Sequence, residues 1–210
     1  MVAMRLVLTA AATALLFVGL AGCVPQETGA LAHPNPIIVR EFTFSPGVVT
    51  LDPSFGFSLY RGSPGVPPGE RAAGVGRAAA FSLADATTAQ LGLLGYDAIR
   101  SESAVPEPGA RAFIISGVFR HIDEGRRRHV GAENANIAVD VDVDYQVGGG
   151  APQRITELHL DSRQIAPSAI VGVAAQRGAD VNLAASRVGG AIARYMSDTA
   201  RLNNWPVASR

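Results

Sequence analysis

Six side chains that can bind a cation or exchange a proton fall at alternating positions of two segments with strand-like patterns. They are Asp140, Asp142 and Asp144 in the first segment and Glu157, His159 and Asp161 in the second. Side chains two residues apart in a strand share a face, about 6.6 Å apart. If both sets lie on one side of a sheet, like charges crowd together, which is destabilising unless something offsets them. We refer to these six residues as the acidic face.

Three interpretations of the acidic face are open. The one we favour is a solvated surface whose carboxylates pair with Arg154, Arg163 and the arginine turn 126–128. The second is a protein-binding surface. The third is a divalent-cation site, with calcium as the candidate ion. Calcium takes six to eight converging oxygen ligands, and carboxylates along a strand diverge more than loop ligands do.

A second charged pattern lies in the C-terminal segment, where Arg187, Arg194 and Arg201 recur every seven residues. Asp198 lies within one helical turn of two of them. Pairing at i,i+3 and i,i+4, worth a few tenths of a kcal/mol, is the simpler interpretation. The alternative is a basic stripe that contacts acidic headgroups or a protein partner.

Motifs for nucleophilic or metal-assisted catalysis are absent from the sequence. It has no G-x-S-x-G, no H-E-x-x-H and no phosphate-loop lysine. A hydrolase would need a loop serine, Ser54, Ser58 or Ser63, to meet His121 or His159 in the fold. We therefore do not predict an enzyme, and we retain the hydrolase only as a second alternative.

The only cysteine, Cys23, ends an apolar run that begins near Leu6, behind a single Arg5. The stretch Leu20-Ala21-Gly22-Cys23 resembles the processing signal of bacterial lipoproteins, in which the cysteine thiol takes a diacylglycerol. An uncleaved membrane anchor is the rival interpretation, because residues 6–24 approach the roughly 20 that a spanning helix needs. Alanines and threonines dilute that run, and a short apolar stretch before small residues is typical of a cleaved signal.

Composition limits the partners. The chain has 210 residues with 18 basic and 18 acidic side chains, so no large field of one sign is available and we predict no nucleic-acid binding. We expect a signal peptide at 1–22, a lipidated tether at 23–36, one domain at 37–205 and a tail at 206–210. No cofactor is predicted apart from the two or three lipid chains that the resemblance implies at Cys23.

The elements that must position these residues follow from periodicity. Strands are predicted at 37–44, 96–101, 112–122, 136–147 and 154–163, and helices at 70–94 and 180–202. Gly95 suits a left-handed helix end and Asp180 suits a helix N-cap. The long segment 48–69 either holds a short strand or lies across the domain. This order, β-α-β-β-β-β-α, predicts an α+β fold with two helices on one face of a mixed, mainly antiparallel sheet.

Several of these segments together resemble bacterial lipoproteins that share the domain of unknown function 4410. The segments are 37–44, Leu94-Gly95-Tyr96, 122–125, 139–145 and Asn203-Asn204-Trp205. The resemblance covers nearly all of the chain after the signal and includes no catalytic motif. It implies a secreted, lipid-attached α+β module.

We therefore expect a non-catalytic, lipid-anchored envelope protein that acts as an adaptor or auxiliary subunit for another envelope protein. Val24 stands where the aspartate associated with inner-membrane retention would be, so the resemblance favours the periplasmic side of the outer membrane. The surfaces expected to make contact are the acidic face and the segment 48–69. The alternative is a periplasmic protein that binds a ligand or divalent cation through the acidic face.

Overall fold

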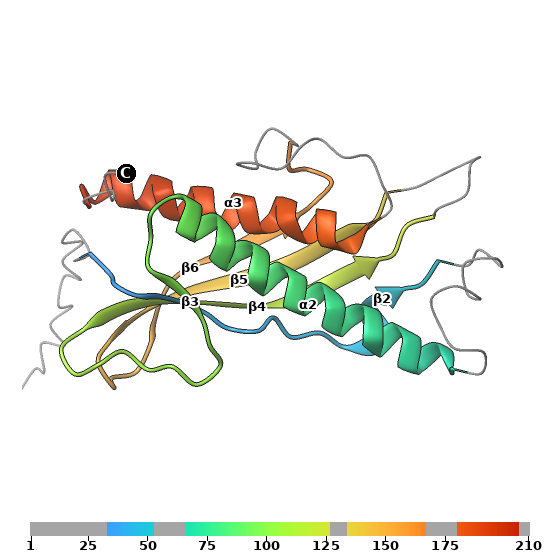
Figure 1. Cartoon of the computed structure of the whole chain (residues 1–210), viewed down its shortest axis with the longest axis horizontal. Helices are drawn as coiled ribbons and strands as arrows, with labels where there is room; N and C mark the ends of the chain where they lie inside the picture. The colour runs from blue at the N-terminus through green and yellow to red at the C-terminus, as the bar shows by residue number, and fades with distance from the viewer. Residues whose placement is uncertain (1–32, 53–65, 127–133, 167–179, 206–210) are drawn as a thin grey trace, which may run out of the picture. The chain divides into compact units, whose positions relative to one another are not determined.

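The structure, a computed structural model, describes residues 33–52, 66–126, 134–166 and 180–205. The described elements are β1 (Ile37–Val39), a 3-10 helix η1 (Pro46–Val48), β2 (Val49–Thr50), α2 (Pro68–Leu93), β3 (Ala98–Arg100), β4 (Arg111–Asp123), β5 (Asn136–Val147), β6 (Gln153–Asp161) and α3 (Val181–Leu202). The predicted α+β class is confirmed: α2 and α3 lie side by side over one face of a mixed sheet (Figure 1). No helix in these ranges is long and apolar enough to cross a membrane.

The six strands combine a parallel half with an antiparallel half. The main path through the sheet is β3-β1-β4-β5-β6, and β2 pairs with one end of β4. β1 runs parallel to both β3 and β4, whereas β4, β5 and β6 pair antiparallel in chain order, which is the antiparallel part of the predicted mixed sheet. The segment 48–69 therefore holds a short strand, β2, in which Val49 lies opposite Ile122 of β4.

β5 forms because β-branched residues alternate with smaller or polar residues along most of its sequence. Ile137, Val139, Val141 and Val143 are buried in the core beneath the helices. The intervening residues must then point to the opposite face of the sheet. This alternation fixes the register, because a slip by one residue would bury the aspartates.

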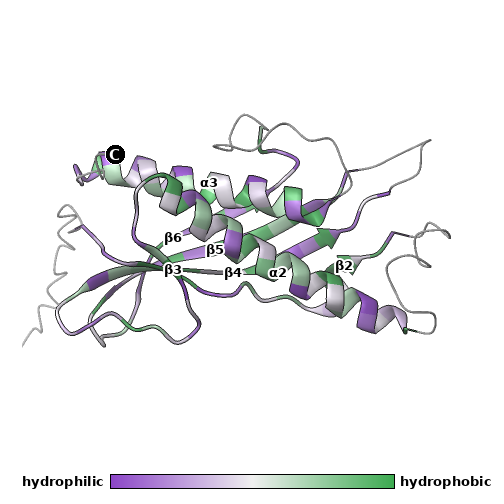
Figure 2. Cartoon of the chain, viewed as in Figure 1, coloured by the Kyte–Doolittle hydropathy of each residue, from purple (hydrophilic) through white to green (hydrophobic). Residues whose placement is uncertain are grey.

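Glycine allows the layers to approach closely. A Cβ on Gly189 of α3 would lie 2.9 Å from the backbone nitrogen of Thr87 in α2, and a Cβ on Gly76 would overlap the ring of Phe44. Gly76 belongs to a G-x-G-x-x-A pattern that resembles a dinucleotide-binding motif. The pattern lies inside α2 rather than at a strand-to-helix turn, which is not the place that a dinucleotide-binding motif requires. Of its two glycines, Gly76 makes a close contact, with the ring of Phe44, and Gly74 makes none. Both helices alternate hydrophilic and hydrophobic patches (Figure 2).

The helix ends have the predicted local chemistry. The Asp180 side chain accepts a hydrogen bond of 2.9 Å from the Asn182 N–H, and Gly95 has a φ of 86°. Beyond α3, the Trp205 ring lies 5.4 Å from that of Phe113 and 6.0 Å from that of His33. His33, within the segment predicted as tether, therefore already contacts the domain.

The described residues cover the sheet face opposite the helices only in part. Ile38, Ala112 and Ile114 form a small buried cluster on this face, and Ala104 packs against it. Val118, farther along β4 on the same face, is 53% exposed. The uncovered part of this face carries the charged residues described next.

Candidate functional site

The structure brings all six residues of the acidic face onto one side of the sheet. In the β5–β6 register, Asp140 lies opposite His159, Asp142 opposite Glu157, and Ala138 opposite Asp161. Directly opposed residues in an antiparallel pair project from the same side. A β-bulge between Val143 and Asp144 shifts the register and places Asp144 opposite Arg154.

Arginines pair with four of the five carboxylates. Arg154 bridges two of them, with 2.6 Å from Nη1 to Asp142 Oδ1 and 2.7 Å from Nε to Asp144 Oδ1. Arg163 lies 3.2 Å from Asp161. Both arginines were expected to neutralise this surface. The pairing expected of Arg154 and Arg163 is therefore present, while residues 127 and 128 of the arginine turn lie outside the described residues.

The fourth pairing was not predicted from sequence. Arg120 Nε lies 2.7 Å from Asp140 Oδ1, whereas the only partners expected from the sequence were Arg154, Arg163 and the turn 126–128. A signal was present in the sequence, because Arg120 lies two residues after Val118 in β4 and residues two apart in a strand share a face. It was obscured by the irregularity between Phe119 and His121, which shifts the β4–β5 register.

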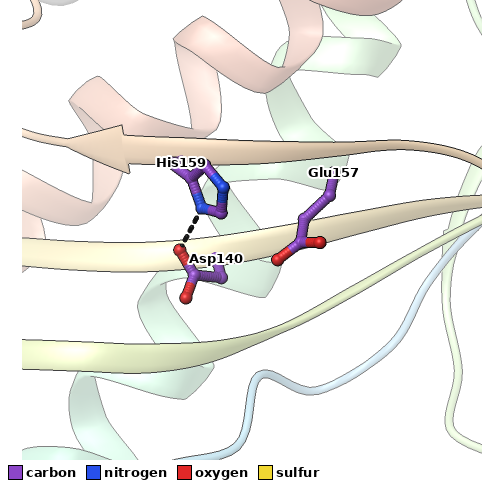
Figure 3. Close-up of side chains that lie close together, drawn as sticks. All are labelled: Asp140, Glu157 and His159. Atoms are coloured by element: carbon purple, nitrogen blue, oxygen red, sulfur yellow. Dashed lines mark hydrogen bonds and ion pairs between the residues drawn. The ribbon is translucent and has the colours of Figure 1, made fainter.

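A closer group forms where β5 and β6 meet (Figure 3). His159 Nδ1 lies 2.6 Å from Asp140 Oδ1. With Glu157 they offer three donor atoms within 4.8 Å of one another. This set fits calcium poorly, because calcium takes six to eight oxygens and here one donor is a nitrogen. Asp140 Oδ1 also already meets both Arg120 and His159, so a cation would have to displace them.

Electrostatics differ along the face. Burial raises the pKa of Asp142; Arg154 opposes this rise, while the neighbouring carboxylates reinforce it. Burial of Asp161 also tends to raise the pKa of its carboxyl. The hydrogen bonds from Arg163 and the charge of Arg163 outweigh this effect and hold the pKa below its usual range. The hydrogen bond to Asp144 raises the pKa of Arg154, so this bridging cation stays charged.

The face is a surface rather than a pocket. The side chains of Asp140 and Asp142 are 28% and 27% exposed, and that of His159 is 64% exposed. Glu157 has no ion-pair partner among the described residues. The carboxylates of such a surface can exchange their arginine partners for a basic group of another molecule. Glu157 can bind such a basic group without giving up an existing ion pair.

The basic stripe is only partly paired. Arg201 Nη1 lies 3.3 Å from Asp198 Oδ1, at the expected i,i+3 spacing. Within the described ranges, Asp198 makes no ion pair with Arg194. The simpler interpretation of the stripe therefore accounts for Arg201 and leaves Arg187 and Arg194 without ion-pair partners in that part of the chain.

Other candidates are separated or lie beyond the described residues. His121 Nε2 is 3.9 Å from Asp123. Cys23 and the stretch 20–22, the three loop serines, and most of the segment 48–69 lie outside the described ranges. An open groove of about 310 Å³ runs between α2 and α3, lined in part by Phe81, Asp85 and Asn182.

Comparison with known proteins adds no assignment to this geometry. No protein-family model matches the chain, and no curated protein matches it. The interpretation of the acidic face therefore depends on its own residues.

Proposed function

We propose that this chain is a lipid-anchored envelope protein that works by contact, as an adaptor or auxiliary subunit, and that the acidic face is its contact surface. One observation carries the proposal: the face holds more acidic than basic groups, and Glu157 has no ion-pair partner among the described residues. The partner that this chemistry fits is a protein with an exposed cluster of arginine or lysine side chains.

The placement in the envelope is supported by the sequence Leu20-Ala21-Gly22-Cys23. Two or more acyl chains at Cys23 would hold the protein to a bilayer, because stable attachment takes two membrane-binding signals. The periplasmic side of the outer membrane is the proposed location. There the domain would present its acidic face to other envelope proteins.

Intact-mass analysis of the membrane fraction tests the anchor. A mature chain that begins at an acylated Cys23, and its loss in Cys23→Ala, is the expected result. An N-terminus that still carries Met1, or an unmodified thiol at position 23, would refute the lipid anchor.

Crosslinking of the membrane-attached protein tests the contact surface. Capture of a basic partner should fall when Asp140, Asp142 and Asp144 are all changed to Asn. It should also fall between 0.1 M and 1 M salt, as the screening length shrinks from about 10 Å to about 3 Å.

The matched control removes the same charge elsewhere. Asp85, Asp97 and Asp198 are exposed and lie off the acidic face, so their change to Asn should leave capture intact. Equal loss in both triple variants would indicate a general charge effect. Unchanged capture in both would exclude the acidic face as the contact surface.

A further inference from the structure

Among the described residues, β6 forms a long, unpaired edge of the sheet. β6 is the last strand in the sheet order, and no described strand pairs with its outer side. It has nine residues and none is buried, although Ile155, Leu158 and Leu160 pack against the core. Proteins usually shorten or block exposed edges, because unpaired backbone groups can pair with another chain.

One backbone hydrogen bond shows which groups of β6 face outward. The Ser162 N–H donates to the Ile137 carbonyl at 2.9 Å, directly beyond the Ala138–Asp161 pair. Hydrogen-bonded and non-hydrogen-bonded pairs alternate along an antiparallel ladder. The backbone groups of Leu158 and Leu160 therefore point to β5, and those of Glu157 and His159 point to the open edge.

Charge selects one register for a second β6 strand at this edge. If Leu158 of each copy lies opposite the other, Glu157 of each copy lies opposite His159 of the other. The free N–H and C=O groups of these residues then match one another. Two neighbouring registers are disfavoured by like-charge repulsion. If residue 157 of each copy lies opposite the other, Glu157 faces Glu157. If residue 159 of each copy lies opposite the other, Glu157 faces Asp161.

We propose that two copies of this chain pair antiparallel through their β6 edges, with Leu158 at the two-fold axis, to form one continuous sheet. The His159 side chain can take part because Nδ1 is held by Asp140, which leaves Nε2 to face Glu157 of the second copy. The pairing keeps the helices of both copies on the same side. It needs neither the lipid nor a basic partner. In the dimer Glu157 contacts His159 of the second copy, so a basic partner would be bound by the remaining carboxylates of the acidic face.

Cysteine crosslinking of the full chain in its host envelope tests the register. Opposed residues at a non-hydrogen-bonded site have Cα atoms about 4.5 Å apart, within the range that a disulfide spans. Leu158→Cys should therefore give a covalent dimer under mild oxidation. Thr156→Cys should not, because its neighbour is Leu160 of the second copy, but Thr156→Cys co-expressed with Leu160→Cys should.

The parent chain, oxidised in parallel, controls for Cys23. No dimer from either Leu158→Cys or the mixed pair would overturn the proposal, as would equal crosslinking of Thr156→Cys alone, which indicates another register. Failure of lipidation would appear instead as a Cys23 crosslink in the parent chain, so the two ideas fail in different ways.

A proline tests the backbone bonds directly. The Glu157 N–H is not used in the ladder to β5, so Glu157→Pro should leave the domain folded while removing one intermolecular donor per copy. We expect dimer dissociation, measured by light scattering, to be about tenfold or more easier than in Glu157→Ala. Monomers whose Glu157 and His159 amides resist hydrogen exchange would mean that another part of the chain covers this edge, and would overturn the proposal.

Discussion

Gly189 lies where α3 meets α2, and changing it to alanine tests how closely the helices pack. A Cβ at this position would lie 2.9 Å from Thr87 N, 3.0 Å from the carbonyl carbon of Ala86 and 3.1 Å from Ala86 Cβ. Two of these atoms belong to the backbone of the facing helix, so they cannot rotate away. The helices must separate to admit the methyl group.

The size of the effect follows from two opposing terms. Alanine is favoured over glycine in a helix interior by about 1 kcal/mol. Inserting a methyl group into a close-packed contact costs typically about 1–3 kcal/mol. We therefore expect Gly189→Ala to lower the free energy of unfolding by up to about 2 kcal/mol. Gly74 in α2 has no heavy atom within 4 Å of its added Cβ, so Gly74→Ala should raise it by about 1 kcal/mol.

Urea denaturation of the two variants beside the parent measures both values. For a domain of this size, each kcal/mol corresponds to roughly 2–4 °C in Tm, so the variants should move in opposite directions on a thermal scan. Gly92→Ala, where the added Cβ also meets nothing within 4 Å, is a second control. If Gly189→Ala stabilises the protein as much as Gly74→Ala does, the inferred helix contact is wrong.

Three further predictions concern buried and charged groups. Glu124 is 4% exposed and its Oε2 accepts a hydrogen bond from the Asp52 N–H at 3.1 Å. Glu124→Ala should therefore lower the free energy of unfolding, measured in urea, by about 1–3 kcal/mol, and Glu124→Gln should lower it by less. A Glu124→Ala variant as stable as the parent would contradict this. Burial raises the pKa of Asp142, so the folded state favours the protonated carboxyl. The contribution of Asp142 to the free energy of unfolding is therefore largest below the unfolded pKa of about 3.9, and it is lost as the pH rises through the folded pKa. Asp142→Asn should thus gain stability relative to the parent between pH 4 and pH 7, whereas Asp161→Asn, whose parent carboxyl has a lowered pKa, should lose it; parallel pH profiles would refute both. Calcium should leave Tm unchanged, and a rise in Tm that Asp140→Asn abolishes would restore the cation interpretation.

Strict local patterns made much of the fold predictable. The alternation in β5 predicted both bounds of the strand and the core side of Ile137, Val139, Val141 and Val143. It was wrong at the C-terminal end of the strand, where Val147 is exposed and Gln146 is buried. The ends of the helices were visible because Asp180 and Gly95 satisfy geometric needs confined to a few residues. Interactions confined to a few neighbouring residues can be predicted from the local sequence.

What sequence reasoning missed or left open depends on distant contacts. β2 has two residues and exists only because it pairs with the end of β4. The Arg120–Asp140 pair requires the β4–β5 register, which an irregularity shifts. The shared side of Asp142 and Glu157 was conditional until the pairing of β5 with β6 was known. No periodicity within one segment specifies such relations.

The exposure of the acidic face follows from topology as well as from composition. Asp144 lies opposite Ile114, whose side chain is covered in the small cluster to which Ala104 contributes. Farther along β5, Asp140 lies opposite Val118, which is 53% exposed. The boundary between covered and open surface therefore crosses the same two strands. Both described helices lie on the opposite face, so no described element covers the charged part of this face, and no described strand pairs with the β6 edge beside it. Pairing at that edge would join the acidic faces of two copies into one surface.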